Sequence, residues 1–68
     1  MKIWILFELD YYAEHFVSAH SSRLSAEAAF LAIPKRTAMV ELERTEDFTA
    51  WGDRGCWDYC VREIEVAT

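Results

Sequence analysis

Four side chains in this sequence belong to types that bind metals or attack substrates: Cys56, Cys60, His15 and His20. The cysteines follow the spacing C-x₃-C, whereas redox motifs and zinc knuckles use C-x₂-C. On a strand, four residues span about 13 Å, which is beyond the reach of a disulfide. The two histidines are five residues apart, so on a strand they point to opposite faces. The pattern therefore predicts two reduced thiols and no metal or cofactor, with a two-His, two-Cys zinc site as the alternative.

Catalytic signatures are missing from the sequence. Nucleophilic catalysis needs a cysteine or serine beside an oriented histidine, and no local pattern joins these residue types here. Acidic pairs such as Glu41 and Glu43 can do acid–base chemistry, but on an exposed strand face such pairs are usually only solvated. The chain has 2 glycines, too few for a phosphate-binding loop. We therefore predict a protein that is not an enzyme.

Negative charge is concentrated in the second half of the chain. Residues 1–40 carry four acids and four bases, whereas residues 41–65 carry eight acids and three arginines, which accounts for the net charge of −5. Nucleic-acid binding needs a basic face, so direct contact with nucleic acid is not expected. A basic protein partner is expected instead. The alternative is that the charge serves only solubility.

Aromatic residues in the acidic half are candidates for contacts with that partner. Trp51 lies in "TAWGDRG", which is predicted to be an exposed loop, and an aromatic ring displayed among charges is typical of an interface anchor. Glu41 and Glu43 are expected about 6.6 Å apart on one strand face, comparable with the spacing of successive nucleic-acid phosphates. Such a row of acids could occupy a basic groove meant for nucleic acid. The predicted partner-binding residues are Glu41, Glu43, Glu46, Asp47, Trp51, Asp53, Trp57 and Tyr59.

The length and the first residues limit the kind of protein. A chain of 68 residues is enough for one domain, expected to span residues 1–68. The apolar run from Ile3 to Phe7 is too short for a secretory signal, which needs about 7–15 apolar residues, or for a transmembrane helix. We therefore expect a protein without membrane contact that works in the cytoplasm.

The stretch "SSRLSAEAAFLAIP" at residues 21–34 predicts a helix at about residues 23–33. Ser21 or Ser22 can cap the first turn by accepting hydrogen bonds from free backbone N–H groups, and Pro34 prevents continuation. Apolar residues recur at helical spacing and predict the face that packs on a sheet. This face is expected to contain Leu24, Ala26, Ala28, Phe30, Leu31 and Ile33.

The remaining elements are predicted to be strands and loops. Strands are expected at residues 2–9, near residues 15–20, and at residues 56–66, because these stretches are rich in β-branched and aromatic residues. Residues 37–44 alternate as a strand does, although a helical continuation is an alternative. Residues 45–55 are expected to be a loop, with Gly52 and Gly55 marking turns. The fold class is therefore α+β, an antiparallel sheet in the order β-β-α-β-β with one helix packed on one face.

The first strand is apolar on both faces. Its two faces are lined by Ile3, Ile5, Phe7 and Leu9 and by Trp4 and Leu6. One helix can cover only one face of a sheet, and we expect the Trp4 and Leu6 face to need another cover. A symmetric homodimer through this face is one solution, and a foreign protein is the other.

The stretches "MKIWILFELDYY", "HSSRLSAEAAF" and "YCVREIEV" together resemble small ββαβ proteins encoded by phages and prophages. The resemblance covers about residues 1–33 and 57–66, and the insert from Pro34 to Cys56 departs from it. It implies an accessory protein of a mobile element that acts in the host cytoplasm. Small acidic inhibitors of host defence, anti-CRISPR proteins especially, are similar in size and charge.

This resemblance implies a function for the acidic half of the chain. An anti-CRISPR-like inhibitor would bind a host protein with a basic nucleic-acid-binding surface and block the DNA-binding surface of a CRISPR effector complex. Two alternatives remain: a phage interaction or assembly module with no defence target, and a small metal-binding or catalytic domain.

Overall fold

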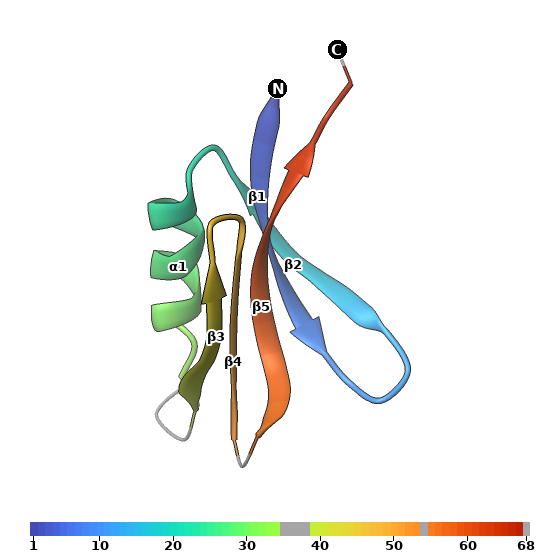
Figure 1. Cartoon of the computed structure of the whole chain (residues 1–68), viewed down its shortest axis with the longest axis vertical. Helices are drawn as coiled ribbons and strands as arrows, with labels where there is room; N and C mark the ends of the chain where they lie inside the picture. The colour runs from blue at the N-terminus through green and yellow to red at the C-terminus, as the bar shows by residue number, and fades with distance from the viewer. Residues whose placement is uncertain (35–38, 54, 68) are drawn as a thin grey trace.

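The computed structural model describes residues 1–34, 39–53 and 55–67 (Figure 1). Within these residues, five strands form one antiparallel sheet in the order β2-β1-β5-β4-β3, and one helix, α1, lies on one side of it. The predicted α+β class and the single helix on one face are confirmed. The elements are β1 (Lys2–Leu9), β2 (Glu14–His20), α1 (Arg23–Leu31), β3 (Val40–Thr45), β4 (Phe48–Asp53) and β5 (Cys56–Glu65).

The predicted strand order lacked one strand. Phe48–Asp53, expected to be part of a loop, forms β4, so the order is β-β-α-β-β-β. Gly52 lies inside this strand, and a Cβ at its position would collide with the carbonyl oxygen of Cys56. Glycine is therefore needed for a close approach of two backbones and not for a turn. Only Gly55, with a φ of 81°, has the left-handed conformation of a turn glycine among the described residues.

The sequence predicts a strand at residues 37–44, with a helix as the alternative. The stretch from Val40 onward belongs to β3 and is a strand, whereas residues 37 and 38 lie outside the described residues. The first and last predicted strands agree closely with β1 and β5. The predicted cap is also confirmed, because the Ser22 hydroxyl accepts a hydrogen bond of 3.1 Å from the backbone N–H of Ser25.

The hydrophobic core lies between α1 and one face of the sheet. Leu6 of β1 and Val61 of β5 are fully buried and cluster with Ala26 and Phe30 of α1. The ring of Phe30 stacks on that of Trp51 in β4, with centroids 3.9 Å apart and planes inclined by 9°. The small side chain of Ala26 lets the helix lie close to the sheet. Phe30 can therefore pack in one cluster with residues of β1, β4 and β5.

The helix buries a narrower face than the sequence predicted. Leu24 is 80% exposed and Leu31 is 56% exposed, and Ala28 is also exposed, whereas Ala26 and Phe30 are buried. The inclusion of Leu24, Ala28 and Leu31 in the packed face was therefore wrong. Two apolar stripes share the same helical period, and the stacking of Phe30 on a strand that was not foreseen selects the second stripe.

The prediction that the Trp4 and Leu6 side of β1 needs a partner was also wrong. Leu6 is fully buried under α1, and Trp4 packs against the same core. The uncovered side is the opposite one, where the register pairs Ile3 with Ile64, Ile5 with Arg62, and Phe7 with Cys60. Cross-strand partners share a face, so these residues define a surface that we call the open face.

Candidate partner-binding surfaces

The eight residues predicted to bind a partner lie on several parts of the molecule. Trp51 and Tyr59 face α1, Glu46 and Asp47 form the turn between β3 and β4, and Asp53 ends β4. The structure therefore does not bring all eight into one surface.

Trp51 departs most from the prediction. It is only 7% exposed, because its ring is stacked on Phe30 in the core, so it cannot be the exposed anchor that was expected. The reason is that its segment is a strand paired on both sides, with β3 and with β5, and not a loop.

The expected row of acids on β3 is interrupted. Glu41 pairs with Trp51 and Glu43 pairs with Ala50, with a shift of register between them. Trp51 and Ala50 are adjacent in β4, so the two glutamates lie on opposite faces of the sheet. Glu41 is also paired with Arg44, at 3.2 Å. The two carboxylates therefore do not reproduce the spacing of successive phosphates.

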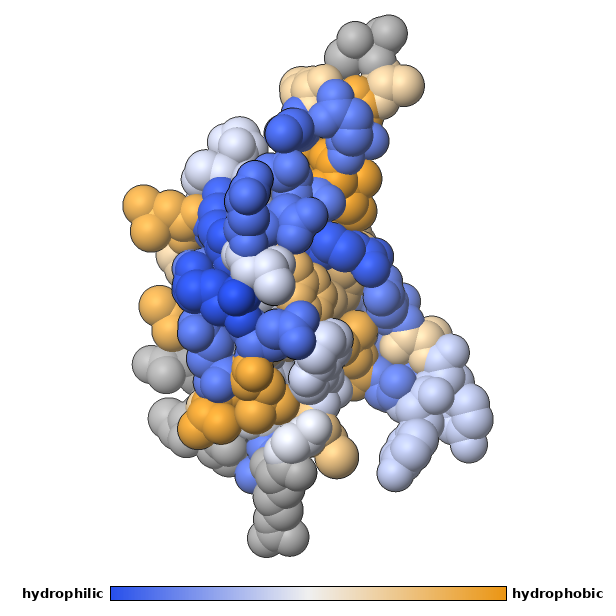
Figure 2. Space-filling model, viewed as in Figure 1, coloured by the Kyte–Doolittle hydropathy of each residue, from blue (hydrophilic) through white to orange (hydrophobic). Residues whose placement is uncertain are grey.

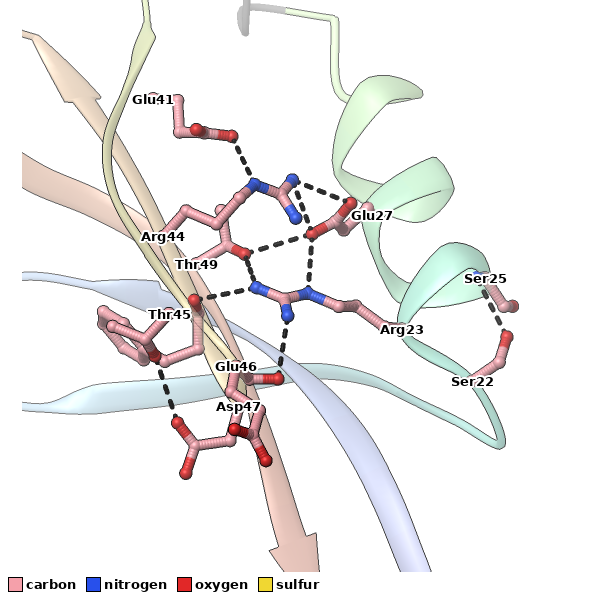
Figure 3. A network of polar contacts seen from close by, with 11 residues as sticks. Ser22, Arg23, Ser25, Glu27, Glu41, Arg44, Thr45, Glu46, Asp47 and Thr49 are labelled. Carbon is pink, nitrogen blue, oxygen red and sulfur yellow. Dashed lines mark hydrogen bonds and ion pairs between the residues drawn. The ribbon is translucent and has the colours of Figure 1, made fainter.

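A polar network joins α1 to the β3–β4 hairpin on the covered side (Figure 3). The carboxylate of Glu27 accepts hydrogen bonds from Arg23 at 3.1 Å, from Arg44 at 3.0 Å and from the fully buried Thr49 at 3.1 Å. Arg23 also donates to the carbonyl oxygens of Glu46 and Phe48, both at 2.9 Å. The hydrogen-bonding groups of this network are paired with one another, so its role is structural. We call the network of Arg23, Glu27, Arg44 and Thr49 the clasp.

The ionisation of Glu27 follows from these contacts. Partial burial raises the pKa of its carboxyl, but the hydrogen bonds from Arg44, Thr49 and Arg23 outweigh burial and hold the pKa below its ordinary value. The carboxylate is therefore charged at neutral pH and forms ion pairs with both Arg23 and Arg44.

Carboxylates gather at the opposite end of the sheet, where β1 and β4 end and β5 begins. Glu8, Asp10, Asp53 and Asp58, which we call the acidic end, line a cleft of about 420 Å³. Apolar and aromatic side chains complete its wall. They are Leu9, Met39 and Tyr59.

A second cleft, of about 210 Å³, adjoins the first and shares Leu9, Asp10 and Asp58 with it. Its other lining residues are Tyr11, Cys56 and Trp57. Trp57 is 43% exposed, so an aromatic ring stands next to two carboxylates at the surface. A site that combines carboxylates with aromatic rings suits a cationic group such as a lysine or arginine side chain.

The acidic end is held by its own hydrogen bonds. Asp10 accepts from the backbone N–H of Tyr12 at 2.7 Å and of Ala13 at 2.9 Å, and contacts the ring of His15 at 2.6 Å. The bond from Tyr12, followed by those from His15 and Ala13, holds the pKa of the Asp10 carboxyl below its ordinary value. This carboxylate therefore stays charged and fixes the loop between β1 and β2.

Tyr59 connects the acidic end to the core. Its hydroxyl donates a hydrogen bond of 2.9 Å to Glu8, and its ring lies 5.8 Å from that of Phe30. Burial, and then the bond to Glu8 and the negative charges nearby, raise the pKa of Tyr59 above 10.0, so the hydroxyl stays protonated. The Glu8 carboxylate is thus oriented without losing its charge.

Sequence reasoning found part of the acidic end. Asp53, Trp57 and Tyr59 were predicted partner-binding residues and line the two clefts. Glu8, Asp10 and Asp58 were missed, because the antiparallel pairing of β1 with β5 brings them together across about fifty residues of sequence. The signal available was an acid at the end of an apolar strand, as in "FELD".

Hydrophilic residues also cover the side where α1 meets the β3–β4 hairpin, whereas hydrophobic residues reach the surface beside the upper parts of β1 and β5 (Figure 2). The described residues contain no helix long and apolar enough to cross a membrane.

The two cysteines are free thiols, Cys56 exposed and Cys60 buried. Burial raises the pKa of the Cys60 thiol, which therefore stays protonated and unreactive at neutral pH. Among residues 1–34, 39–53 and 55–67, no three His, Cys, Asp or Glu side chains converge as a metal site would require.

We expect the urea midpoint of unfolding to be the same with and without reductant and chelator. Neither a disulfide nor a metal is then part of the folded state, as the spacing of the cysteines along β5 implies. Circular dichroism during urea titration measures this. A clear fall in the midpoint on adding EDTA would revive the two-His, two-Cys zinc site, and a fall with reductant would indicate a disulfide.

Comparison of the chain with known protein families, with curated proteins and with solved structures finds no match.

Proposed function

We propose that this protein is a small, non-enzymatic inhibitor that binds a host nucleic-acid-handling protein in the host cytoplasm. It occupies the basic surface that normally receives nucleic acid. The observation that carries the proposal is the acidic end, where Glu8, Asp10, Asp53 and Asp58 line one cleft. A CRISPR effector complex is the partner that the resemblance to anti-CRISPR proteins implies.

Electrostatics favour a cationic occupant of the acidic end. Two unit charges about 4 Å apart interact with about 1 kcal/mol in bulk water and about 4 kcal/mol near a protein surface. Several carboxylates around one cleft therefore repel phosphate and attract lysine or arginine. Association driven in this way is fast and becomes weaker as salt concentration rises.

Aromatic side chains supply the contact that charge alone does not. The exposed ring of Trp57 and the ring of Tyr59 border the two clefts. A guanidinium group that enters between a carboxylate and an aromatic face gains both an ion pair and a cation–π contact. Arginines of the partner that normally bind nucleic-acid phosphates would then bind this protein instead.

Removing charge from the acidic end is expected to abolish binding. The test variant combines Glu8→Gln, Asp53→Asn and Asp58→Asn, which keep the size of each side chain. Asp10 is left in place, because it holds the loop between β1 and β2. The control variant combines Glu43→Gln, Glu46→Gln and Asp47→Asn, which removes the same charge from the β3–β4 hairpin, away from both clefts.

The measurement is a pull-down from host lysate at rising salt, followed by a DNA-binding assay of the captured protein after purification. We expect the unmodified protein and the control variant to block DNA binding, and the test variant to leave it intact. A captured protein with no role in nucleic-acid handling would contradict the proposal. So would binding that is indifferent to both the test variant and salt.

One observation favours a second function, an interaction or assembly module in which the acids serve only solubility. It is the apolar character of the open face, which is separate from the acidic end. In that case the test variant above would bind as well as the unmodified protein, and substitutions on the open face would abolish binding instead.

A further inference from the structure

The open face presents apolar side chains that α1 does not cover. The register places Phe16 of β2 opposite Phe7, and Phe48 of β4 opposite Arg62, so both phenylalanines belong to this face. Phe16 is 64% exposed. No helix in the described residues covers this side, because α1 packs on the other.

Aromatic rings and small buried residues lie side by side on this face. The rings of Phe48 and Trp57 lie 5.2 Å apart, while Ala50 and Cys60, which are paired between the same two strands, are almost fully buried. The sheet therefore presents a surface of ring faces and edges, as the inner side of a β-sandwich does.

Most of the charge on this face cancels within the chain, and Glu43, which pairs with Ala50 of β4, adds one carboxylate on the edge strand β3. Arg62 and Glu14 form an ion pair of 2.7 Å, and the Arg62 guanidinium lies 4.9 Å from the centre of the Phe7 ring. The acidic end lies elsewhere, at the ends of the strands. A second copy of this chain, although it carries a net charge of −5, can approach here without strong repulsion. A strongly charged partner finds nothing complementary.

The projected area of the open face approaches the area that each partner of a dimer buries. The chain exposes 4725 Å², against about 4,400 Å² expected for a compact monomer of its mass. Four neighbouring strands of about seven residues present a projected area of about 440 Å². The exposed side chains of Phe16 and Trp57 add to this projection, and each partner of a specific interface contributes roughly 600–800 Å².

We infer that the open face packs against the open face of a second copy, forming a symmetric dimer in which the two sheets are stacked. Aligned sheets pack about 10 Å apart with strands inclined by about 30°, and a two-fold axis makes one face self-complementary. The inference does not depend on the proposed function, because the four carboxylates of the acidic end lie at the strand ends, although the ring of Trp57 contributes both to the open face and to the second cleft.

The first test uses the unmodified chain. Sedimentation equilibrium between about 10 µM and 1 mM should give the mass of a dimer, and the unfolding midpoint should rise with protein concentration. A monomer mass over the whole range, or a midpoint independent of concentration, would overturn the inference. These two readouts remain valid even if a variant fails to fold.

The second test locates the interface. Phe16→Glu should give a folded monomer, because it places an unpaired charge within the stacked faces, on the edge strand β2, while altering a side chain that is mostly exposed in one chain. The matched control is Leu24→Glu on the outer side of α1, where Leu24 is 80% exposed, and it should stay dimeric. A dimeric Phe16→Glu, or a dimer lost only in Leu24→Glu, would show that another surface is used.

Discussion

Replacing Phe30 with alanine should lower the free energy of unfolding by about 3–5 kcal/mol. The side chain is 3% exposed, stacks on Trp51 at 3.9 Å and contacts Tyr59, so its removal leaves a cavity in the middle of a small core. A single core in a chain of this size supplies about 3–5 kcal/mol in total. The variant should therefore be largely unfolded at room temperature unless dimerisation supports it.

The matched control for this loss is Leu24→Ala on the same helix. Leu24 is 80% exposed, so its truncation should change the free energy of unfolding by no more than about 0.5 kcal/mol. Urea unfolding followed by circular dichroism measures both variants. Equal losses in the two would mean that α1 packs through its Leu24 stripe, as the sequence first indicated.

Replacing Glu27 with glutamine should cost about 2–3 kcal/mol of stability at neutral pH. The carboxylate is mostly buried, with its side chain 18% exposed, and it pairs with Arg23 and Arg44 while accepting a bond from Thr49. Glutamine carries no charge, so both ion pairs, with Arg23 and with Arg44, are lost. The clasp between α1 and the β3–β4 hairpin should then open first.

The same carboxylate gives the stability a defined pH dependence. Its pKa in the folded protein lies below the ordinary 4.5, so its contribution is fully present above pH 4.5 and is lost as pH falls through the lowered value. The difference in unfolding free energy between the unmodified protein and Glu27→Gln should therefore be constant from neutral pH down to about 4.5 and shrink in more acidic solution. Measuring this difference cancels the titration of other groups, including Asp10.

Glu41→Gln is the control for this prediction. Glu41 contacts only the outer part of the clasp, through Arg44, and its side chain is 44% exposed. Exposed pairs of this kind contribute about 1 kcal/mol or less. A loss in Glu41→Gln as large as in Glu27→Gln would show that burial does not set the strength of the clasp.

Local patterns in the sequence predicted the elements whose signals are local. β1 follows from a run of β-branched and aromatic residues, and α1 from the capping Ser22 and the stop at Pro34. The sequence does not predict β4, because Gly52 beside Asp53 is typical of a turn, whereas in the structure it allows two strands to approach closely. A glycine in a turn and a glycine at a close approach look the same in one sequence.

The candidate site could be predicted only in part for a related reason. Which helix stripe is buried depends on Trp51, and which carboxylates converge depends on the register of β1 with β5. Neither is encoded within ten residues of sequence. Asp53, Trp57 and Tyr59 were predicted because they lie close together along the chain. Glu8 was not predicted, because only the tertiary structure brings it to the same cleft.

The position of β5 has a consequence for how the chain folds. β1 pairs only with β2 and β5 in the described sheet, and β4 only with β3 and β5, so two hairpins remain separate until β5 inserts between them. β5 follows β4 closely in the chain and can pair with it locally, but the edge of β1 stays unpaired until the distant contact between β1 and β5 forms, which makes folding slow. The same unpaired edge of β1 can accept β5 from a neighbouring molecule, so we expect crowded refolding conditions to favour strand-exchanged copies.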